Sequence, residues 1–249
     1  MNLSDPTLAP RGRIHWLTPP ADTQPQCTDC AVRDMALFGP LASDWLGHAH
    51  DFVSALSLPP GQRLLGRGHQ GQAVYTVRRG VLRAERYTED GQRRIVRLAG
   101  PGALLGSEAL SGQAQVDDLI ACTEVSLCRI SLGLFPPATE RGQAMAIPVL
   151  RQLQRDMDAM VHWSVHLTRG SARSRLLQLL ALLDRHAEAD GSAWLPRRDE
   201  IGDMLDLTLE TASRQFSAVH KAGVVQVLSL QRMRVDRPAL AAAIAALAD

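Results

Sequence analysis

The residues that decide the fold of the C-terminal part run from Arg198 to Gly223 and read RDEIGDMLDLTLETASRQFSAVHKAG. Ile201, Met204 and Leu205 give a first short helix an apolar face, and the hydroxyl of Thr208 can cap a second helix. Apolar residues then recur at the three- and four-residue spacing of one buried helix face: Leu209, Ala212, Phe216 and Val219. The pattern predicts two helices joined by a tight turn.

The chain after this stretch changes its period. Gly223 can take the left-handed conformation that often follows a helix end. Residues 224 to 235 then alternate like a hairpin, with arginines on and beside it. A helix-turn-helix followed by a hairpin is the arrangement of a winged helix.

The outward face of the second helix carries Glu210, Ser213 and Arg214. In the major groove of DNA, guanine offers two acceptors to an arginine fork, and the amino group of cytosine donates to a carboxylate. An ordinary surface ion pair between Glu210 and Arg214, worth about 0.2–0.5 kcal/mol, would not explain the surrounding turn, cap and hairpin. We therefore predict that these three residues read bases. Residues predicted to contact the DNA backbone are Thr208, Ser217, Lys221, Arg232 and Arg234.

These residues also carry a resemblance. The run IGDMLDLTLETASRQF resembles the helix-turn-helix of the cyclic-AMP receptor protein and FNR (CRP/FNR) family of bacterial transcription regulators, and ETASR resembles its FNR branch. The resemblance implies that Glu210, Ser213 and Arg214 read a half-site similar to TTGAT. It also implies RNA polymerase as a partner.

Composition agrees with such a protein. A chain of 249 residues with 45% hydrophobic residues is long enough for two domains. Its net charge of +1 is compatible with DNA binding, because counterion release depends on the phosphates contacted rather than on total charge. The sequence shows no membrane-length apolar run or signal-like N-terminus, so we expect a cytoplasmic protein. It also shows no Ser-His-Asp arrangement, phosphate loop or HExxH motif, so we predict that it is not an enzyme.

The part before the helix-turn-helix predicts an α+β protein. From about Leu58 to Ile130, short alternating segments separated by glycine turns predict an all-β roll. The runs PGQRLL, YTVRRGVLR and PGALLG resemble the cyclic-nucleotide-binding domain of the same family. The predicted parts are a flexible N-terminal arm (1–26), a sensory cyclic-nucleotide-binding-like β-roll with an N-terminal cysteine loop (27–137), a long dimerisation helix (138–169) and a C-terminal winged helix-turn-helix (170–249).

Heptad spacing marks the predicted long helix. Apolar residues from Ala146 onward recur at alternating spacings of four and three, which is typical of a helix that pairs with a partner. A helix packed on its own domain would give the same pattern. Two recognition helices related by a two-fold axis enter successive major grooves about 34 Å apart, which favours a homodimer on double-stranded palindromic DNA. The residues predicted to form the dimer contact are Leu150, Leu153, Met157, Met160 and Leu167.

Cyclic nucleotide is one possible effector. In the nucleotide-binding branch, a glycine and a glutamate are followed about ten residues later by an arginine and a serine that hold the phosphate. Gly106 and Glu108 match the first part. The second part, residues 112–118, reads GQAQVDD, which has no arginine and two carboxylates that would repel a phosphate. The sequence therefore argues against cyclic nucleotide.

The cysteines suggest a second effector. Cys27 and Cys30 are spaced so that two thiolates can reach one metal, and QCTDC resembles the N-terminal cluster loop of FNR. Cys128 lies where that family has its distant cysteine, so a [4Fe–4S] cluster is one hypothesis. The family's remaining cysteine is replaced by Ala36, although such a cluster needs four ligands. Candidates for the missing ligand are Cys122, Asp34, His48 and His50.

Other interpretations stay open at this point. Cys27 and Cys30 could form a thiol redox switch or bind another metal, and His162 and His166, four residues apart, could bind haem. The sensor could also have lost its effector. A different class of function is a redox- or ligand-binding module whose winged helix contacts protein, and such a module would lack the steep salt dependence of DNA binding.

Overall fold

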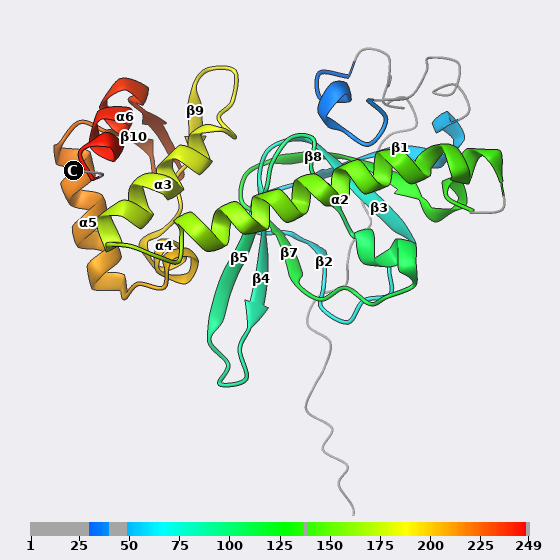
Figure 1. Ribbon diagram of the computed structural model, residues 1–249, viewed down its shortest axis with the longest axis horizontal. Coiled ribbons are helices and arrows are strands. Elements are labelled where there is room, and N and C mark those ends of the chain that lie inside the picture. Colours follow the sequence, from blue (N-terminus) through cyan, green and yellow to red (C-terminus); the bar gives the residue numbers. More distant parts are fainter. Residues whose placement is uncertain (1–29, 40–48, 137–138, 248–249) are drawn as a thin grey trace, which may run out of the picture.

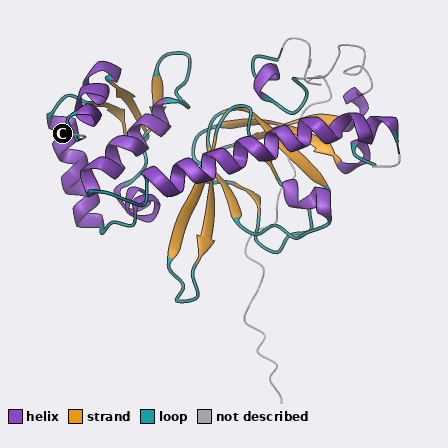
Figure 2. Cartoon of the chain, in the orientation of Figure 1, coloured by secondary structure: helices purple, strands orange, loops and turns teal. Residues whose placement is uncertain are grey.

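The computed structural model describes residues 30–39, 49–136 and 139–247 of the chain (Figure 1). The predicted N-terminal arm, Cys27 and His48 lie outside the described residues. The chain passes from a β-rich unit through one long helix into a smaller, mostly helical unit with its own sheet (Figure 2). This arrangement confirms the predicted α+β fold.

The β-rich unit is the predicted roll. Two four-stranded antiparallel sheets, ordered β1-β8-β3-β6 and β2-β7-β4-β5, enclose an apolar core that includes Val77, Leu82 and Leu127. Gly80 turns the chain between β3 and β4 with φ of +85°, and a Cβ atom there would lie 2.3 Å from the carbonyl oxygen of Glu124. The strands are β1 (Val53–Leu58), β2 (Arg63–Leu65), β3 (Ala73–Arg79), β4 (Leu82–Tyr87), β5 (Arg93–Ala99), β6 (Leu104–Leu105), β7 (Asp118–Ala121) and β8 (Val125–Ser131).

Short 3-10 turns complete the roll. Two of them precede β1, one lies between β6 and β7, and one follows β8. The turn between β6 and β7, η4, begins after Gly106, whose φ is +71°. The turns are η2 (Arg33–Met35), η3 (His50–Phe52), η4 (Ser107–Ser111) and η5 (Leu132–Leu134).

Helix α2 (Glu140–His166) crosses the roll and leads to the C-terminal unit (Figure 1). The hydroxyl of Thr139 caps it by accepting a hydrogen bond from the Gly142 N–H, at 3.1 Å. Two polar contacts attach the helix to the roll. The Gln152 amide donates to the carbonyl oxygen of Gly102 at 3.0 Å, and Asp156 pairs with Arg97 at 2.7 Å.

The C-terminal unit is the predicted winged helix-turn-helix. Its core, built around Leu176, Leu180 and Phe216, continues into the roll through Val81 and Ile95, so both units share one apolar cluster. Its elements are α3 (Ala172–Asp184), β9 (Ser192–Trp194), α4 (Arg198–Leu205), α5 (Leu209–Lys221), β10 (Val225–Ser229), β11 (Arg232–Val235) and α6 (Arg237–Ala245), with sheet order β10-β11-β9.

Candidate nucleic-acid interface and cysteine site

The turn between α4 and α5 depends on two unusual backbone positions. Asp206 ends α4 with φ of +55°, the one positive value at a described residue other than glycine. A Cβ atom at Gly202 would lie 2.7 Å from the carbonyl oxygen of Leu207, so this close approach requires glycine. Thr208 then caps α5 as predicted, with its hydroxyl accepting from the Thr211 N–H at 3.2 Å. The turn thereby sets the angle of α5.

Helix α5 divides into a buried and an exposed face. Ala212, Phe216 and Val219 are buried as predicted. The prediction was wrong for Leu209, which is 59% exposed, because it is the first residue of the helix and lies on the outer side of the turn.

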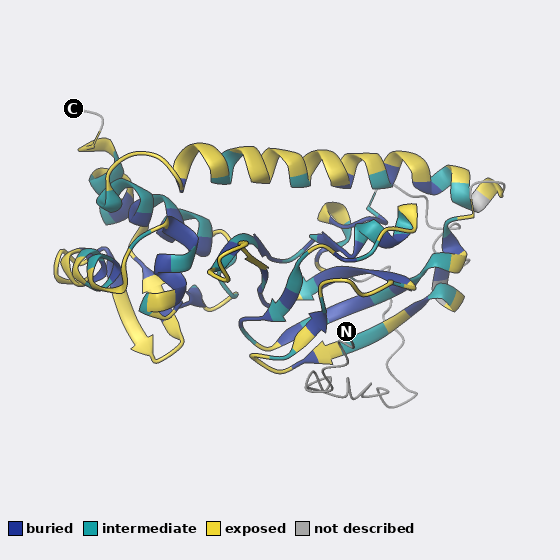
Figure 3. Cartoon of the chain, turned by 90° about the horizontal axis from the view of Figure 1, so that it is seen from below, coloured by how far each residue is buried: buried dark blue, intermediate teal, exposed yellow. Residues whose placement is uncertain are grey.

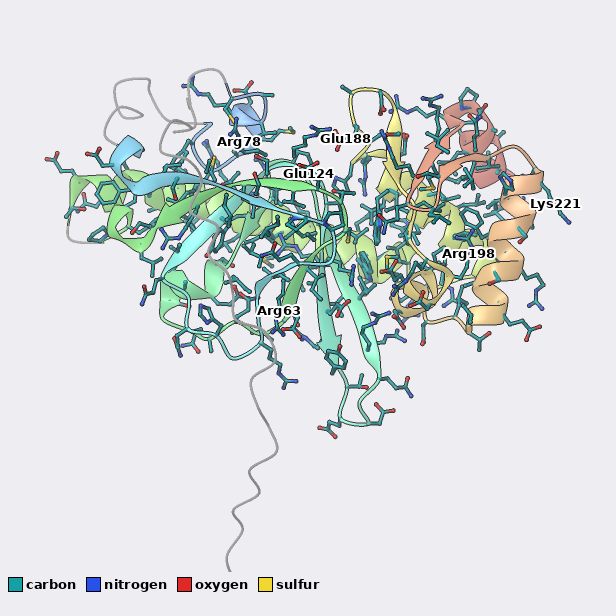
Figure 4. The ribbon with its side chains drawn as sticks, turned by 180° about the vertical axis from the view of Figure 1, so that it is seen from behind. Arg63, Arg78, Glu124, Glu188, Arg198 and Lys221 are labelled. Atoms are coloured by element: carbon teal, nitrogen blue, oxygen red, sulfur yellow. The ribbon has the colours of Figure 1, made fainter. Side chains whose placement is uncertain are left out.

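The exposed face of α5 presents the three predicted base-reading residues. The side chains of Glu210 and Arg214 are 88% and 65% exposed, and Ser213 is partly exposed beside them. The carboxylate oxygen Oε1 of Glu210 lies 3.9 Å from Nη1 of Arg214. An exposed pair at that distance contributes little, so both groups are available to a partner. Thr208, Ser217 and Lys221 are also exposed, and Figure 4 shows Lys221 on the outer side of α5.

The two arginines of the wing, the β10–β11 hairpin, contact groups of the protein itself. Arg232 pairs with Asp190 at 2.7 Å, and Arg234 donates to the carbonyl oxygen of Asp190 at 3.2 Å. Hydrogen bonds from Ser192, followed by Arg232, hold the pKa of Asp190 at about 2. The contact of these two arginines with DNA phosphates stays a prediction. To contact a phosphate, Arg232 would have to leave the carboxylate of Asp190.

A hollow of about 800 Å³ lies between the roll and the loop before β9. Arg232 and Asp190 line it together with Cys30, Arg78 and residues of the facing loop. Figure 4 shows Arg78 and Glu188 on its two sides, where the neighbouring Arg79 pairs with Glu188 at 2.9 Å. The two units therefore meet through charged groups here as well as through the shared core.

Sequence reasoning missed Arg198 at the start of α4. Its guanidinium carbon lies 3.4 Å from the centroid of the Phe216 ring, a cation–π contact, and burial lowers the pKa of the group. The contact joins the first helix of the motif to the recognition helix. A pattern of helical periodicity gives no signal for it, because it depends on how the two helices pack.

One side of α2 is exposed along most of the helix (Figure 3), and an apolar stripe runs along it. It contains the predicted Leu150, Leu153, Met157 and Met160, and three residues that were not predicted, Ile147, Val161 and Val165. The prediction was wrong for Leu167, which is fully buried in the chain's own core because α2 ends at His166. Its side chain has no surface to offer a second subunit.

Cys30 and Cys128 line one small cavity of about 20 Å³ together with Ala36 and Thr76. The structure thus brings two of the predicted thiols close to Ala36, where the resemblance implied a further cysteine. Asp34 is exposed and does not line this cavity.

Cys122 lies apart from that cavity. It is buried in the cluster shared by the roll and the C-terminal unit, and its Sγ is 3.8 Å from Nη1 of Arg83. Burial raises the pKa of Cys122 to about 12, so it is a neutral thiol at physiological pH. The structure does not bring Cys122 together with Cys30 and Cys128.

The cysteine cavity is small and mostly apolar. A volume of about 20 Å³ has room for about one water molecule. The buried Oγ1 of Thr76 has no hydrogen-bond partner among the described residues. Within those residues no three His, Cys, Asp or Glu side chains gather to hold a metal ion. The two thiols that the described residues place at this cavity are fewer than the four protein ligands that a four-iron cluster needs.

The two carboxylates that argued against cyclic nucleotide are held by the roll itself. Arg86 binds Asp117 through two bonds of 2.6 and 3.1 Å, and Arg63 lies 3.4 Å from Asp118. The loop that would need to attract a phosphate therefore presents carboxylates already paired with arginines. The absence of cyclic-nucleotide binding stays a prediction.

The histidines considered for haem, His162 and His166, lie near the end of α2 with ring centroids 4.5 Å apart. Burial, followed by the charges of Arg185 and His166, lowers the pKa of His162.

None of the described helices is both long and apolar enough to cross a membrane.

Comparison with known proteins agrees with this geometry. The family model of the cyclic nucleotide-binding domain matches residues 55–138. The chain is 30% identical over 177 residues to the transcriptional regulatory protein Btr of Bordetella pertussis, covering 68% of this chain and 72% of that protein. It is 29% identical over 209 residues to the transcriptional activator protein FnrL of Cereibacter sphaeroides, covering 80% and 84%. The structure of FixK2 from Bradyrhizobium japonicum matches with a TM-score of 0.66 and 25% identity, covering 76% and 96%.

A β-roll joined by a long helix to a winged helix-turn-helix, with relatives that regulate transcription, defines a DNA-binding transcription regulator rather than an enzyme. The chain belongs to the CRP/FNR family of bacterial transcription regulators.

Proposed function

We propose that the protein binds a palindromic operator as a homodimer and reads half-sites similar to TTGAT through Glu210, Ser213 and Arg214. The observation that carries this proposal is the exposed, weakly paired face of α5. Its carboxylate and its guanidinium match the donor of cytosine and the acceptors of guanine.

The exposed apolar stripe of α2 supports the homodimer. Seven large apolar side chains on one helix, each at least 36% exposed, form a surface that a second copy would cover. Helix α5 lies beyond the C-terminal end of α2 in Figure 1, so parallel pairing of two α2 helices would bring both copies of α5 to one end of the dimer. That arrangement suits two successive major grooves.

The names of several relatives support the partners that we propose. FnrL is a transcriptional activator, and activation would require contact with RNA polymerase. Since its proposed partners are DNA and RNA polymerase, we expect the protein to act in the cytoplasm.

We further propose that oxygen or redox state controls the protein through the cavity that Cys30 and Cys128 line. Two relatives, the anaerobic regulatory protein of Haemophilus influenzae and the fumarate and nitrate reduction regulatory protein of Vibrio cholerae, support a role in anaerobic growth. An iron–sulfur cluster would be held by Cys27, Cys30 and Cys128 and would need a fourth ligand. The described residues do not supply one.

The test is operator binding by anaerobically purified protein, before and after exposure to air, together with iron and acid-labile sulfide analysis. We expect a palindromic site to be bound, and its affinity to change with air in the parent protein and in Cys122→Ala but not in Cys128→Ala. Iron and sulfide in the parent would identify a cluster, and their absence would identify a thiol switch. An identical response to air in all three proteins would contradict control through Cys128.

A further inference from the structure

A row of carboxylates on α4 faces a group of arginines on the β4–β5 hairpin of the roll. Asp199, Asp203 and Asp206 follow one another at spacings of four and three, which places them on one side of the helix. We call the whole set of facing charges the α4 clamp, and it consists of Arg83, Glu85, Arg93, Arg94, Asp199, Glu200, Asp203 and Asp206.

The outer part of the clamp is centred on Arg93. Its Nη2 lies 2.6 Å from Oδ2 of Asp203 and 3.2 Å from Oδ2 of Asp199, and its Nε donates to the same Asp203 oxygen at 2.8 Å. The neighbouring Arg94 pairs with Asp206, the residue with positive φ that ends α4. One strand of the sensory roll therefore holds the helix along its length and at its turn.

The inner part of the clamp is buried. The side chains of Arg83 and Glu200 are only 12% and 6% exposed, with Nη1 of Arg83 3.5 Å from Oε1 of Glu200. Glu85, also buried, accepts from Nε of Arg83 at 2.6 Å. Glu200 additionally accepts from the backbone N–H of Arg197 at 2.8 Å, at the beginning of α4. Buried charges of this kind tolerate one geometry, because moving one group leaves the others unpaired.

The clamp acts on α4 and leaves the base-reading face of α5 uncovered. Figure 1 shows α5 at the far end of the molecule, on the other side of the motif from the β4–β5 hairpin. Because Gly202 and Leu207 hold the turn closely, and Arg198 stacks on Phe216, the orientation of α4 determines that of α5.

We propose that the α4 clamp holds the helix-turn-helix in the orientation that reads the operator, and that Arg83, Arg93 and Arg94 are positioning residues for DNA recognition. The inference rests on the proposed operator binding. A change in the sensory roll that withdrew the hairpin would release α4. Two copies of α5 would then lose the fixed spacing that a palindrome requires.

Two substitutions of opposite charge separate positioning from simple electrostatics. Arg93→Ala removes a positive charge and Asp203→Asn removes a negative charge. A general effect of charge on DNA affinity would lower binding in the first variant and raise it in the second. The clamp predicts that both variants lose operator affinity, by about five- to thirtyfold. It also predicts that the double variant binds the operator no more weakly than the single variant with the larger loss.

The assay compares binding to a palindromic operator and to non-operator DNA of the same length at one salt concentration. We expect non-operator binding to change by less than about threefold, since it depends on phosphate contacts that each half of the dimer makes separately. Arg86→Ala is the matched control, because Arg86 lies on β4 but pairs with Asp117 inside the roll.

The outcomes distinguish this inference from the proposed function. A parent protein that binds the palindrome, with an Asp203→Asn variant that binds it equally or more tightly, would overturn the clamp alone. A parent protein that binds no palindrome would overturn both. If Arg93→Ala does not fold, as judged by its thermal unfolding, Arg94→Ala replaces it, because the Arg94 side chain is 32% exposed and its loss leaves the buried charges paired.

Discussion

Protonation of His186 should weaken the joint between the sensory roll and the DNA-binding domain. Its ring packs against Gly100 of the roll so closely that a Cβ atom at Gly100 would lie 2.1 Å from Nδ1 of His186. Burial at this joint, followed by the charge of Arg185, lowers the pKa of His186 from 6.5 to about 4. The folded protein therefore holds the ring neutral.

The direction of the pH effect follows from these two values. Above pH 6.5 the ring is neutral in both the folded and the unfolded chain, so its contribution to stability is complete. Between pH 6.5 and about 4 the unfolded chain binds a proton that the folded chain does not, and the free energy of unfolding falls as pH falls. The difference between the two pKa values corresponds to a loss of about 3 kcal/mol by pH 4.

The assay is urea unfolding of the parent protein and of His186→Phe between pH 7.5 and pH 4.5. We expect the parent to lose about 2 kcal/mol more than the variant over this range, because phenylalanine keeps a ring at the joint but cannot bind a proton. A His69→Gln variant, which changes an exposed histidine of the roll, should behave like the parent. If His186→Phe loses stability as steeply as the parent, the assignment to His186 is wrong.

Three further substitutions test other contacts. Gly100→Ala should lower the free energy of unfolding by about 1–3 kcal/mol, measured by urea, because its methyl group would overlap the His186 ring; unchanged stability would contradict the close packing. Arg214→Ala should weaken operator binding by about 1–3 kcal/mol and relax the preference at one base pair, whereas Arg232→Ala should weaken all sequences alike; uniform loss in both would refute the base-reading assignment. Met157→Asp, on the exposed stripe of α2, should yield monomers in sedimentation experiments, and a stable dimer would exclude that face.

Local sequence signals predicted the helix-turn-helix well. The Thr208 cap and the buried positions of α5 depend on residues within one or two turns of each other, so periodicity and capping suffice to find them. Leu209 and Leu167 mark the limit of this reasoning. A periodic pattern of apolar residues can continue past the end of a helix, and it does not show which surface covers each residue. The prediction that Leu209 is buried and the prediction that Leu167 contacts a second subunit were both wrong, and both residues lie at helix ends.

Long-range contacts could not be predicted from the residues alone. Arg93 and Asp203 are 110 residues apart, and the local sequence around neither residue indicates the other as its partner. The placement of Cys30 and Cys128 at one cavity was expected only from family resemblance, because their 98-residue separation carries no periodic signal. The separation of Cys122 depends on its burial between the roll and the C-terminal unit, a joint that the sequence pattern does not reveal.

The most direct measurement is footprinting of the dimeric protein on DNA containing two inverted TTGAT-like half-sites, with Arg214→Ala as a parallel sample. We predict symmetric protection of both half-sites, centred about one helical turn apart, and loss of that protection in the variant. Absence of a protected palindrome under both anaerobic and aerobic conditions, with a folded dimer confirmed in the same sample, would contradict recognition through α5.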